Sequence, residues 1–539
     1  MKPIQEEASA VLHLESLPSA ALIPMSAAEQ TLYEQIVPED HFLRRLPQAV
    51  DFESFRALLT SAYCPDQGRP PLDPVTLLKL EVLARQYKLS DREVITGARF
   101  NIAYRLFLGL SLTSPLPHHT SMTYFRQRLT PQRLQQVFDA LVGQARRLGL
   151  VKDRLRLKDA THILANIAIP STIRLVAEAR DQLLDALQPF APQRVTAEEQ
   201  RAEAIRLGTE DAKDEERLLQ RVTHLRAVLA WADDVPRQEG FHQQPEQAQQ
   251  RLPSALVLAH KILADREDPK AGDKVLSVHD ADARRGMHGG YYEGYLLDVA
   301  MDADSEIITA VNVLPANGDE GADAAVLIGQ EEQAQGNDVA AVSIDGAGYR
   351  GKVLRALTDP AGLHLEVFTP PSDRPPAKGF PAERFTLTVI DGRPTLTCPA
   401  GQTTHSRDRN EDNTAYRYRF DKAQCSGCPL RDECLVKPNA QRRVVVKNDY
   451  EAEYAAAQAK AQTPEYAAVR RRHPAIERKL SELVRRHDVR HARYRGQPRV
   501  LYQGLLTSLV VNLKRIVRLL FAPADDGAQT VRAALVAGG

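Results

Sequence analysis

Long apolar runs, cysteine and net charge are all scarce in this sequence of 539 residues. No stretch reaches the roughly 18 consecutive apolar residues that a membrane-spanning helix needs, so such a helix is excluded. The N-terminus carries Glu6 and Glu7 and lacks an apolar stretch with a small-residue cleavage site, so we expect no secretory signal. Five cysteines are too few for a disulfide scaffold, which favours a reducing cytoplasm.

The zero net charge argues against a uniformly basic coat, but it hides a strong asymmetry. Residues 298–345 contain eleven acids and no Lys or Arg, whereas residues 466–518 contain fourteen Lys or Arg and three acids. Such blocks suggest a metal-binding or anionic site near a surface that binds a polyanion. Two ordinary solvated faces are the alternative. Hydrophobic residues make up 43% of the chain, enough for a large core, and the length predicts roughly three to four structural units.

Residues 46–150 have the pattern of several short helices. Asp73 before Pro74 and Ser90 before Asp91 are typical of helix N-termini. Arginines on the last two helices suggest a DNA-binding module similar to a helix-turn-helix, and an ordinary helical bundle is the alternative. Residues 173–265 are charged and helical, and we interpret them as a long helical hairpin. Cys64 is expected to be a small core residue.

Strand patterns surround two aspartates. Residues 155–159 (LRLKD) alternate like a half-buried strand that ends at Asp159, and residues 339–344 (VAAVSI) are typical of a buried strand that ends at Asp345. Residues 291–314 indicate a β-hairpin between the two. Residues 359–400 are proline-rich with short strands, and residues 450–520 are helical again.

Acids at these strand ends suggest a binding site for a divalent metal ion. Acids at the carboxyl ends of neighbouring strands can converge at one edge of a sheet, and Mg²⁺ prefers such oxygen ligands. Glu477 is the candidate for a third acid. Ile476, Leu480 and Leu483 give its helix an apolar face, so we expect Glu477 near the core-facing side. A salt-bridged surface glutamate is the alternative.

The order strand–Asp159, hairpin, strand–Asp345, insertion and helix–Glu477 resembles the DDE transposases of bacterial insertion sequences. Their catalytic domain is RNase H-like, which implies an α/β fold here. The resemblance extends over most of residues 30–520 and is carried by residues 38–130, 157–171, 294–324, 344–351 and 476–517. Relatives often place Arg four residues before the glutamate, where this chain has His473. Asp298, Asp302 and Asp304 are alternative acids, which we interpret as hairpin residues.

The resemblance implies a catalytic triad of Asp159, Asp345 and Glu477 that holds two Mg²⁺ or Mn²⁺ ions for DNA strand cleavage and strand transfer. Its partners would be double-stranded DNA, both the terminal inverted repeats and the target, and a second copy of the chain. The protein would act in the bacterial cytoplasm, at the nucleoid. Our candidates for DNA phosphate contacts are Arg470, Arg472, Arg478, Arg485 and Arg486.

Four of the five cysteines fall within 37 residues: Cys398, Cys425, Cys428 and Cys434. Four thiolates suit the tetrahedral coordination of a structural Zn²⁺, and C-x2-C is the usual spacing. A reduced cluster without metal and a redox site are the alternatives.

Competing functions are a related RNase H-like nuclease that cuts without joining, a DNA-binding protein with a decayed active site, and a zinc-stapled scaffold. The predicted architecture is an RNase H-like core with an all-α N-terminal domain and two insertions. Its parts are an N-terminal tail (1–45), a helical DNA-binding-like domain (46–150), the first part of the core (151–360) with a helical insertion (166–270), a β-rich cysteine insertion (361–448), the last part of the core (449–522) and a tail (523–539).

Overall fold

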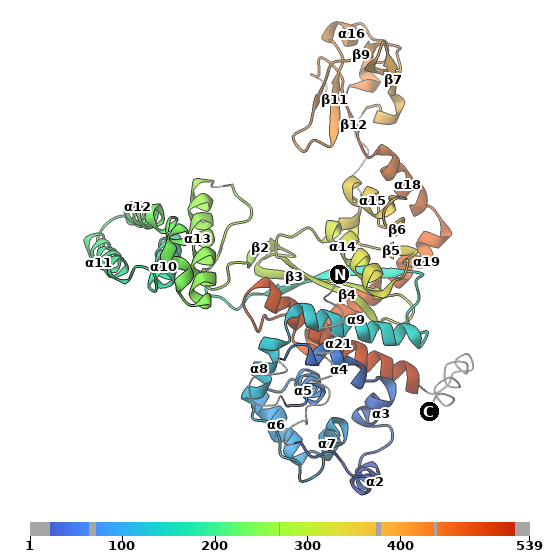
Figure 1. Ribbon diagram of the computed structural model, residues 1–539. Coiled ribbons are helices and arrows are strands. Elements are labelled where there is room, and N and C mark those ends of the chain that lie inside the picture. Colours follow the sequence, from blue (N-terminus) through green and yellow to red (C-terminus); the bar gives the residue numbers. More distant parts are fainter. Residues whose placement is uncertain (1–21, 64–71, 269, 373–378, 436–438, 523–539) are drawn as a thin grey trace. The chain divides into compact units, whose positions relative to one another are not determined.

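A computed structural model describes residues 22–63, 72–268, 270–372, 379–435 and 439–522 (Figure 1). The predicted tail 523–539, the first 21 residues and Cys64 lie outside the described residues. No helix in the described part of the chain is long and apolar enough to cross a membrane. The chain divides into two compact units: the first comprises Met1–Lys152, Ala160–Glu320 and Ile476–Gly539, and the second comprises Asp153–Asp159 and Gly321–Ala475.

Short helices begin the first unit, as the sequence predicts. Asp73 caps its helix by accepting a hydrogen bond from the Thr76 amide, and Ser90 forms a capping box with Glu93. The helices are α2 (Ala27–Ile36), α3 (Phe42–Ala49), η1 (Glu53–Phe55), α4 (Arg56–Thr60), α5 (Pro74–Gln86), α6 (Asp91–Phe100), α7 (Ile102–Leu108), α8 (Thr120–Arg128) and α9 (Pro131–Arg147).

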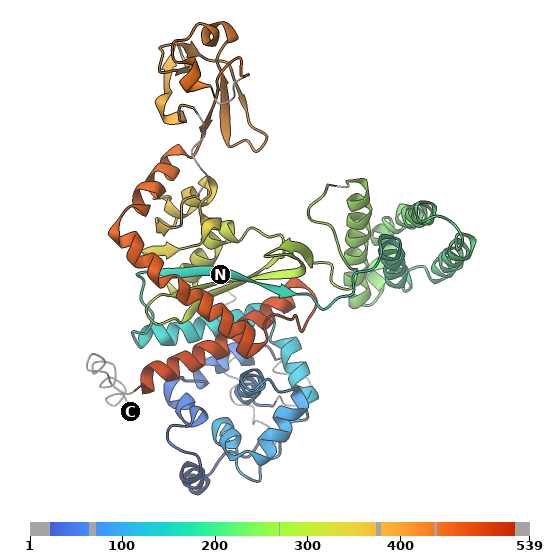
Figure 2. The same cartoon turned by 180° about the vertical axis from the view of Figure 1, so that it is seen from behind.

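The helical insertion is a four-helix module of the first unit (Figures 1 and 2). The prediction of a simple helical hairpin is wrong, because apolar side chains from all four helices join one buried cluster that includes Leu183, Leu225 and Ala259. Its elements are α10 (Thr172–Leu187), α11 (Pro192–Gly208), α12 (Asp214–Ala232), η2 (Val235–Arg237), η3 (Glu239–Gln243) and α13 (Glu246–Glu267).

The predicted hairpin is confirmed as β3 (Tyr291–Asp302) and β4 (Ile308–Pro315), and β2 (Arg284–Met287) pairs with β3. Helix α21 (Gln497–Phe521) packs on β4 and α9 (Figure 2). The side chain of Asn512 fixes this packing, because its amide accepts from the Ile308 amide at 2.8 Å and donates to the Ile308 carbonyl at 2.7 Å. Helix α20 (Pro474–His487) belongs to this unit from Ile476 onward.

Strand β1 (Arg156–Leu164) runs through both units. The prediction that it ends at Asp159 is wrong, because residues 160–164 continue as a strand beside β3. Gly294 of β3 allows the close approach: a Cβ there would lie 2.0 Å from the Ile163 carbonyl oxygen. The first unit therefore contains an antiparallel hairpin next to the second half of β1.

In the second unit, β1 pairs in parallel with β5 (Ala341–Ser343), and β5 pairs in parallel with β6 (Glu366–Phe368). Parallel strands need crossover connections, which helices supply here. The helices before and between these strands are α14 (Glu320–Gln335, in this unit from Gly321), η4 (Gly346–Gly348) and α15 (Gly351–Thr358). Two further helices of this unit come later in the chain, α18 (Glu451–Ala461) and α19 (Pro464–Arg472).

The cysteine-containing insertion forms two small antiparallel sheets in the second unit, β7-β8-β9 and β10-β11-β12. Its cluster of buried apolar side chains is Phe380, Phe385, Leu396, Tyr418, Phe420 and Val445. The elements are η5 (Ala382–Arg384), β7 (Thr386–Ile390), β8 (Arg393–Thr397), β9 (Thr403–Thr404), β10 (Arg407–Arg409), β11 (Ala415–Arg419), α16 (Lys422–Ser426), α17 (Arg431–Cys434) and β12 (Val444–Asn448).

Candidate active site

The register of β1 and β5 brings Asp159 level with Asp345 in the second unit. Leu157 pairs with Ser343, and each aspartate follows its paired residue by two positions. Asp345 keeps an extended backbone, with φ −69° and ψ −166°, although β5 ends at Ser343. Because side chains alternate with a period of two, both aspartates lie on the face that Leu157 and Ser343 share. Two half-buried carboxylates thus lie on neighbouring segments of the sheet, at the level where β5 ends.

The backbone around Asp345 is fixed from three directions. Its carbonyl oxygen accepts from the Thr369 hydroxyl at 2.7 Å, and the amide of Ile344 donates to the Phe368 carbonyl at 3.0 Å. Carboxylate Oδ1 accepts from the Ala347 amide at 3.0 Å and so caps η4. This arrangement holds the carboxylate in one orientation.

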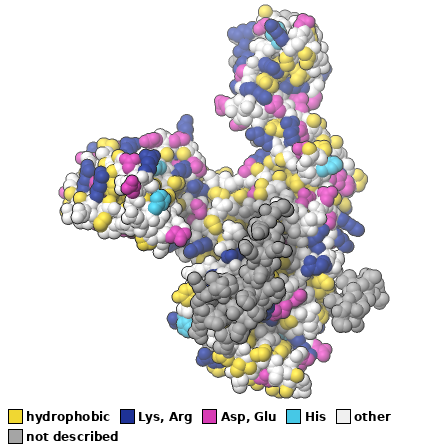
Figure 3. All heavy atoms as spheres, in the orientation of Figure 1, with side chains coloured by type: hydrophobic (Ala, Val, Ile, Leu, Met, Phe, Trp, Pro, Cys, Tyr) yellow, Lys and Arg dark blue, Asp and Glu magenta, His cyan; other side chains and the backbone are white. Residues whose placement is uncertain are grey.

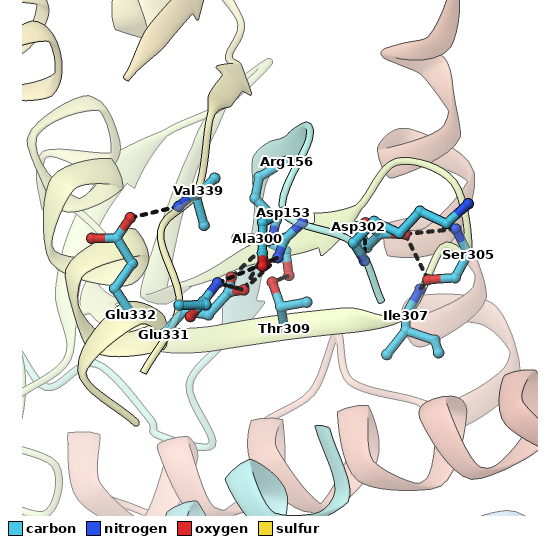
Figure 4. A network of polar contacts seen from close by, with 12 residues as sticks. Asp153, Arg156, Ala300, Asp302, Ser305, Ile307, Thr309, Glu331, Glu332 and Val339 are labelled. Carbon is cyan, nitrogen blue, oxygen red and sulfur yellow. Dashed lines mark hydrogen bonds and ion pairs between the residues drawn. The ribbon is translucent and has the colours of Figure 1, made fainter. Parts of the chain in front are cut away.

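A buried ion pair anchors β1 three residues before Asp159 (Figure 4). The guanidinium of Arg156 contacts Glu331 of α14 through Nε, at 3.1 and 3.0 Å from the two carboxylate oxygens, and through Nη2 at 2.6 Å. Both side chains are fully buried, and Asp153 adds a contact at 3.3 Å. A bidentate pair of this kind is geometrically strict, so it fixes the position of the strand that carries Asp159.

His473 lies against the end of β5. Its Nδ1 is 3.1 Å from the Ser343 hydroxyl, and Arg470 of α19 donates to the same hydroxyl at 3.2 Å and to the Ile344 carbonyl at 2.9 Å. Burial, with a contribution from Arg470, lowers the pKa of His473 to about 4, and nearby Asp345 opposes the shift. His473 is therefore neutral at pH 7 and acts as a hydrogen-bonding contact beside Asp345.

Glu477 belongs to the first unit, on α20. The prediction that it lies near the core-facing side is wrong: Ile476, Leu480 and Leu483 are buried, whereas Glu477 is exposed. At 100° per residue, Glu477 falls just outside the buried stripe of its helix. The structure thus brings Asp159 and Asp345 together and gives Glu477 a solvent-facing position on the predicted helix.

The alternative acids have structural roles in the first unit. Asp302 Oδ2 accepts from the Ser305 amide at 2.7 Å, the Ser305 hydroxyl at 2.8 Å and the Asp304 amide at 3.2 Å, which closes the hairpin turn (Figure 4). Its Oδ1 accepts from the Lys152 amide at 3.2 Å. Asp298 is fully buried within β3. These positions agree with their interpretation as hairpin residues.

The predicted DNA-contacting arginines fall into two groups. Arg470 points inward onto β5, as described above, and Arg472 is exposed. Arg478, Arg485 and Arg486 are exposed and line a pocket of the first unit. Sequence reasoning did not single out Lys514, Arg515 and Arg518, which line the same pocket. Their spacing on one face of a helix was the signal that could have found them.

The four cysteines of the insertion are half-buried free thiols in the second unit. Burial raises the pKa of Cys434; Arg443 opposes the shift, and the neighbouring sulfurs of Cys425, Cys398 and Cys428 add to it. The four thiols therefore share one environment. Among the described residues, however, no group of three or more His, Cys, Asp or Glu side chains is arranged to hold a metal ion. The zinc site remains a prediction.

Two protein-family models match segments of this chain. Residues 31–128, which include the second half of α2 and all of α3 to α8, match the family described as Transposase domain (DUF772). Residues 397–517, which include the cysteine cluster, Glu477 and most of α21, match the family described as Transposase DDE domain. No solved structure matches the chain. Together the two matches support the resemblance to the DDE transposases of insertion sequences that was drawn from the sequence.

Proposed function

We propose that this transposase cuts and joins DNA strands with the carboxylates of Asp159, Asp345 and Glu477. The observation that carries the proposal is the register of β1 and β5, which sets two half-buried aspartates level on one face of the sheet. Buried polar contacts fix both β1, which carries Asp159, and the backbone around Asp345. A mixed sheet with β1 common to an antiparallel hairpin and to parallel strands supports the RNase H-like core that the family resemblance implies.

The chain path supports Glu477 as the third acid. His473 contacts the end of β5, adopts a helical backbone with φ −50° and ψ −40°, and joins α19 to α20. Glu477 follows four residues later, about one helical turn or 6 Å along the axis. We propose Glu477 as the third acid on the strength of this short connection and of the family resemblance.

The donor set suits a hard divalent cation, Mg²⁺ or Mn²⁺. Sites for ions that also bind substrate phosphates commonly use only one or two protein carboxylates, which is the number that β1 and β5 present. The bound ions would neutralise charge on the phosphate and on the leaving oxygen. Asp159, Asp345 and Glu477 would hold the ions.

The residues of the chain would hold the reacting groups in line. In cleavage, a water oxygen forms a bond to phosphorus while the bond to O3′ breaks, which leaves a 3′-hydroxyl and a 5′-phosphate. In joining, that 3′-hydroxyl attacks a target phosphodiester and releases a new 3′-hydroxyl. We propose two copies of the chain in this complex, because two element ends must be paired, with the ends and the target as the bound double-stranded DNA.

Asparagine substitution tests the proposal. Asp159→Asn keeps the shape of the side chain and removes its charge, so we expect unchanged binding to a duplex copied from the DNA that flanks the reading frame, with loss of Mg²⁺-dependent cleavage. Asp304→Asn, in the exposed hairpin turn, is the matched control and should cut normally. Cleavage unaffected by Asp159→Asn would exclude this site. Cutting without joining by the unaltered protein would identify a nuclease, and binding without cutting would identify a decayed enzyme.

We further propose that Cys398, Cys425, Cys428 and Cys434 bind a structural Zn²⁺. The insertion has only a small apolar cluster, and modules of this size commonly need a metal or disulfides for stability. The purified protein should contain about one zinc per chain. Cys428→Ser should release it, and the neighbouring Ser426→Ala should not. A zinc-free protein with four freely titrating thiols in this insertion would contradict the proposal.

A further inference from the structure

A basic pocket of about 550 Å³ lies between α20 and α21 in the first unit, next to the turn of the β3–β4 hairpin. Seven Lys or Arg side chains and two carboxylates line it. Such an excess of positive charge in one hollow attracts anions. Helix α20 also carries Glu477, but the lining includes none of the three proposed catalytic acids, so the pocket can be tested by binding without cleavage.

The inner part of the pocket is ion-paired. Glu482 contacts Lys479 at 3.2 Å and Lys514 at 3.1 Å, and Arg515 donates from Nε to the Ser305 carbonyl at 2.5 Å. Glu306 lies 3.9 Å from Lys479 and 3.7 Å from Arg515. Burial favours the neutral form of Glu482, but Lys479 and Lys514 outweigh it and lower the pKa, so this carboxylate is charged. These contacts hold three cations in fixed positions.

The outer part consists of four exposed arginines: Arg478, Arg485, Arg486 and Arg518. Within the described part of the chain, no carboxylate pairs with any of them. Since both carboxylates of the pocket are used by the inner cations, the four guanidinium groups are available to an external ligand. Guanidinium groups donate in pairs to phosphate oxygens, which favours a phosphate ligand over a simple halide.

The spacing of the arginines suits a polymer of phosphates. Arg478 and Arg485 are seven residues apart on α20, about 10 Å along the helix axis. One strand of duplex DNA advances about 3.4 Å per phosphate, so this distance covers about three nucleotides. The volume likewise exceeds that of a single phosphate ion. A continuous nucleic acid backbone therefore matches the pocket better than a free anion.

We infer that the α20–α21 pocket binds the phosphodiester backbone of one DNA strand, with Arg486 and Arg518 from the two helices as opposing contacts. The inference rests on DNA as the substrate under the proposed function, and it adds Lys514, Arg515 and Arg518 to the binding surface. It assigns these residues a binding role that carries no sequence information, because backbone contacts fix position and not sequence.

The test is the salt dependence of duplex binding, measured without divalent metal so that no cleavage occurs. Each lost phosphate contact should reduce the slope of log K against log salt by about 0.9, so Arg486→Gln/Arg518→Gln should lower it by roughly 1 to 2 and weaken binding at least tenfold at low salt. Both positions are exposed, so thermal unfolding should be unchanged.

Arg206→Gln is the matched control. Arg206 is an exposed arginine of the helical insertion, whose visible face mixes acidic and basic side chains (Figure 3), and it pairs with Glu203. It should leave the slope unchanged. An unchanged slope in the double variant would overturn the inference. If, in addition, inorganic phosphate competes with the duplex for the unaltered protein but not for the double variant, the pocket is a small-anion site. Neither result would affect the Asp159→Asn test, so the two proposals can fail separately.

Discussion

Asp302 and Asp345 lie at the ends of two differently paired strands, and the surroundings of the two aspartates differ. At the end of β3, Asp302 is buried, and its oxygens accept hydrogen bonds from the turn of an antiparallel hairpin. At the end of β5, Asp345 is half-buried and gives one oxygen to the Ala347 amide, on a face that it shares with Asp159. A tight turn exposes amides that need acceptors, so it uses its aspartate for folding.

The ends of parallel strands present a different problem. Their connections are crossovers, so the end of one strand can lie beside a neighbouring strand that carries a second acid, as Asp345 lies beside β1. Antiparallel or parallel pairing of the strand thus distinguishes a structural aspartate from a candidate metal ligand, although both follow an apolar strand in the sequence.

The largest effect is expected at Asp345. Asp345→Asn should lower metal-dependent cleavage by about a thousandfold or more, because a metal ligand contributes several kcal/mol to the transition state. Single-turnover cleavage of the end duplex measures this. Duplex affinity should be unchanged, and cleavage within tenfold of the unaltered protein would contradict the role of Asp345.

The anchor of β1 should matter for stability. Glu331→Gln removes the fully buried carboxylate that pairs with the guanidinium of Arg156, which should cost about 3–5 kcal/mol of unfolding free energy. Urea unfolding of the second unit would measure the loss. Glu332→Gln is the neighbouring control, because its side-chain oxygen can still accept from the Val339 amide. Equal stability of the two variants would show that the buried pair does not hold the strand.

The hairpin aspartate should affect folding and not chemistry. Asp302→Ala leaves the turn amides and the Ser305 hydroxyl without their acceptor, which should cost about 1–3 kcal/mol. Thermal unfolding measures the loss. The folded fraction should cleave at the normal rate, and a selective loss of cleavage without a loss of stability would reverse the comparison drawn above.

The smallest effect concerns pH. Burial lowers the pKa of His473 from 6.5 to about 4, so between these values the unfolded chain binds a proton that the folded chain does not. The stability from this group is complete above about pH 6.5 and is lost as the pH falls toward 4. His473→Asn should reduce the decrease in melting temperature between pH 7 and pH 5, whereas exposed His405→Asn should not. An identical pH dependence in both variants would contradict this assignment.

The local elements were largely predictable from the sequence. The hairpin of β3 and β4, the capped helix α5 and the helix that carries Glu477 all follow from apolar periodicity and turn residues. The register of Leu157 with Ser343 could not be read, because pairing between strands far apart in sequence depends on tertiary contacts.

Three features of the site and its surroundings needed the structure. Residues 160–164 continue β1 because a glycine in β3 lets the two strands approach. Arg470 appeared to be a DNA contact in a basic block, yet Ser343 and the Ile344 carbonyl accept its hydrogen bonds. Charge in a sequence does not reveal such an internal acceptor. The basic pocket, too, combines residues from two helices whose packing the sequence does not specify.

Direct metal binding tests the central claim that Asp159 and Asp345 share a cation. Mn²⁺ binding to the full chain with the end duplex bound can be followed by electron paramagnetic resonance, which needs no turnover. We expect bound Mn²⁺ in the unaltered protein and in Asp304→Asn, and loss of bound Mn²⁺ in both Asp159→Asn and Asp345→Asn. Undiminished Mn²⁺ binding by those two variants would contradict the account.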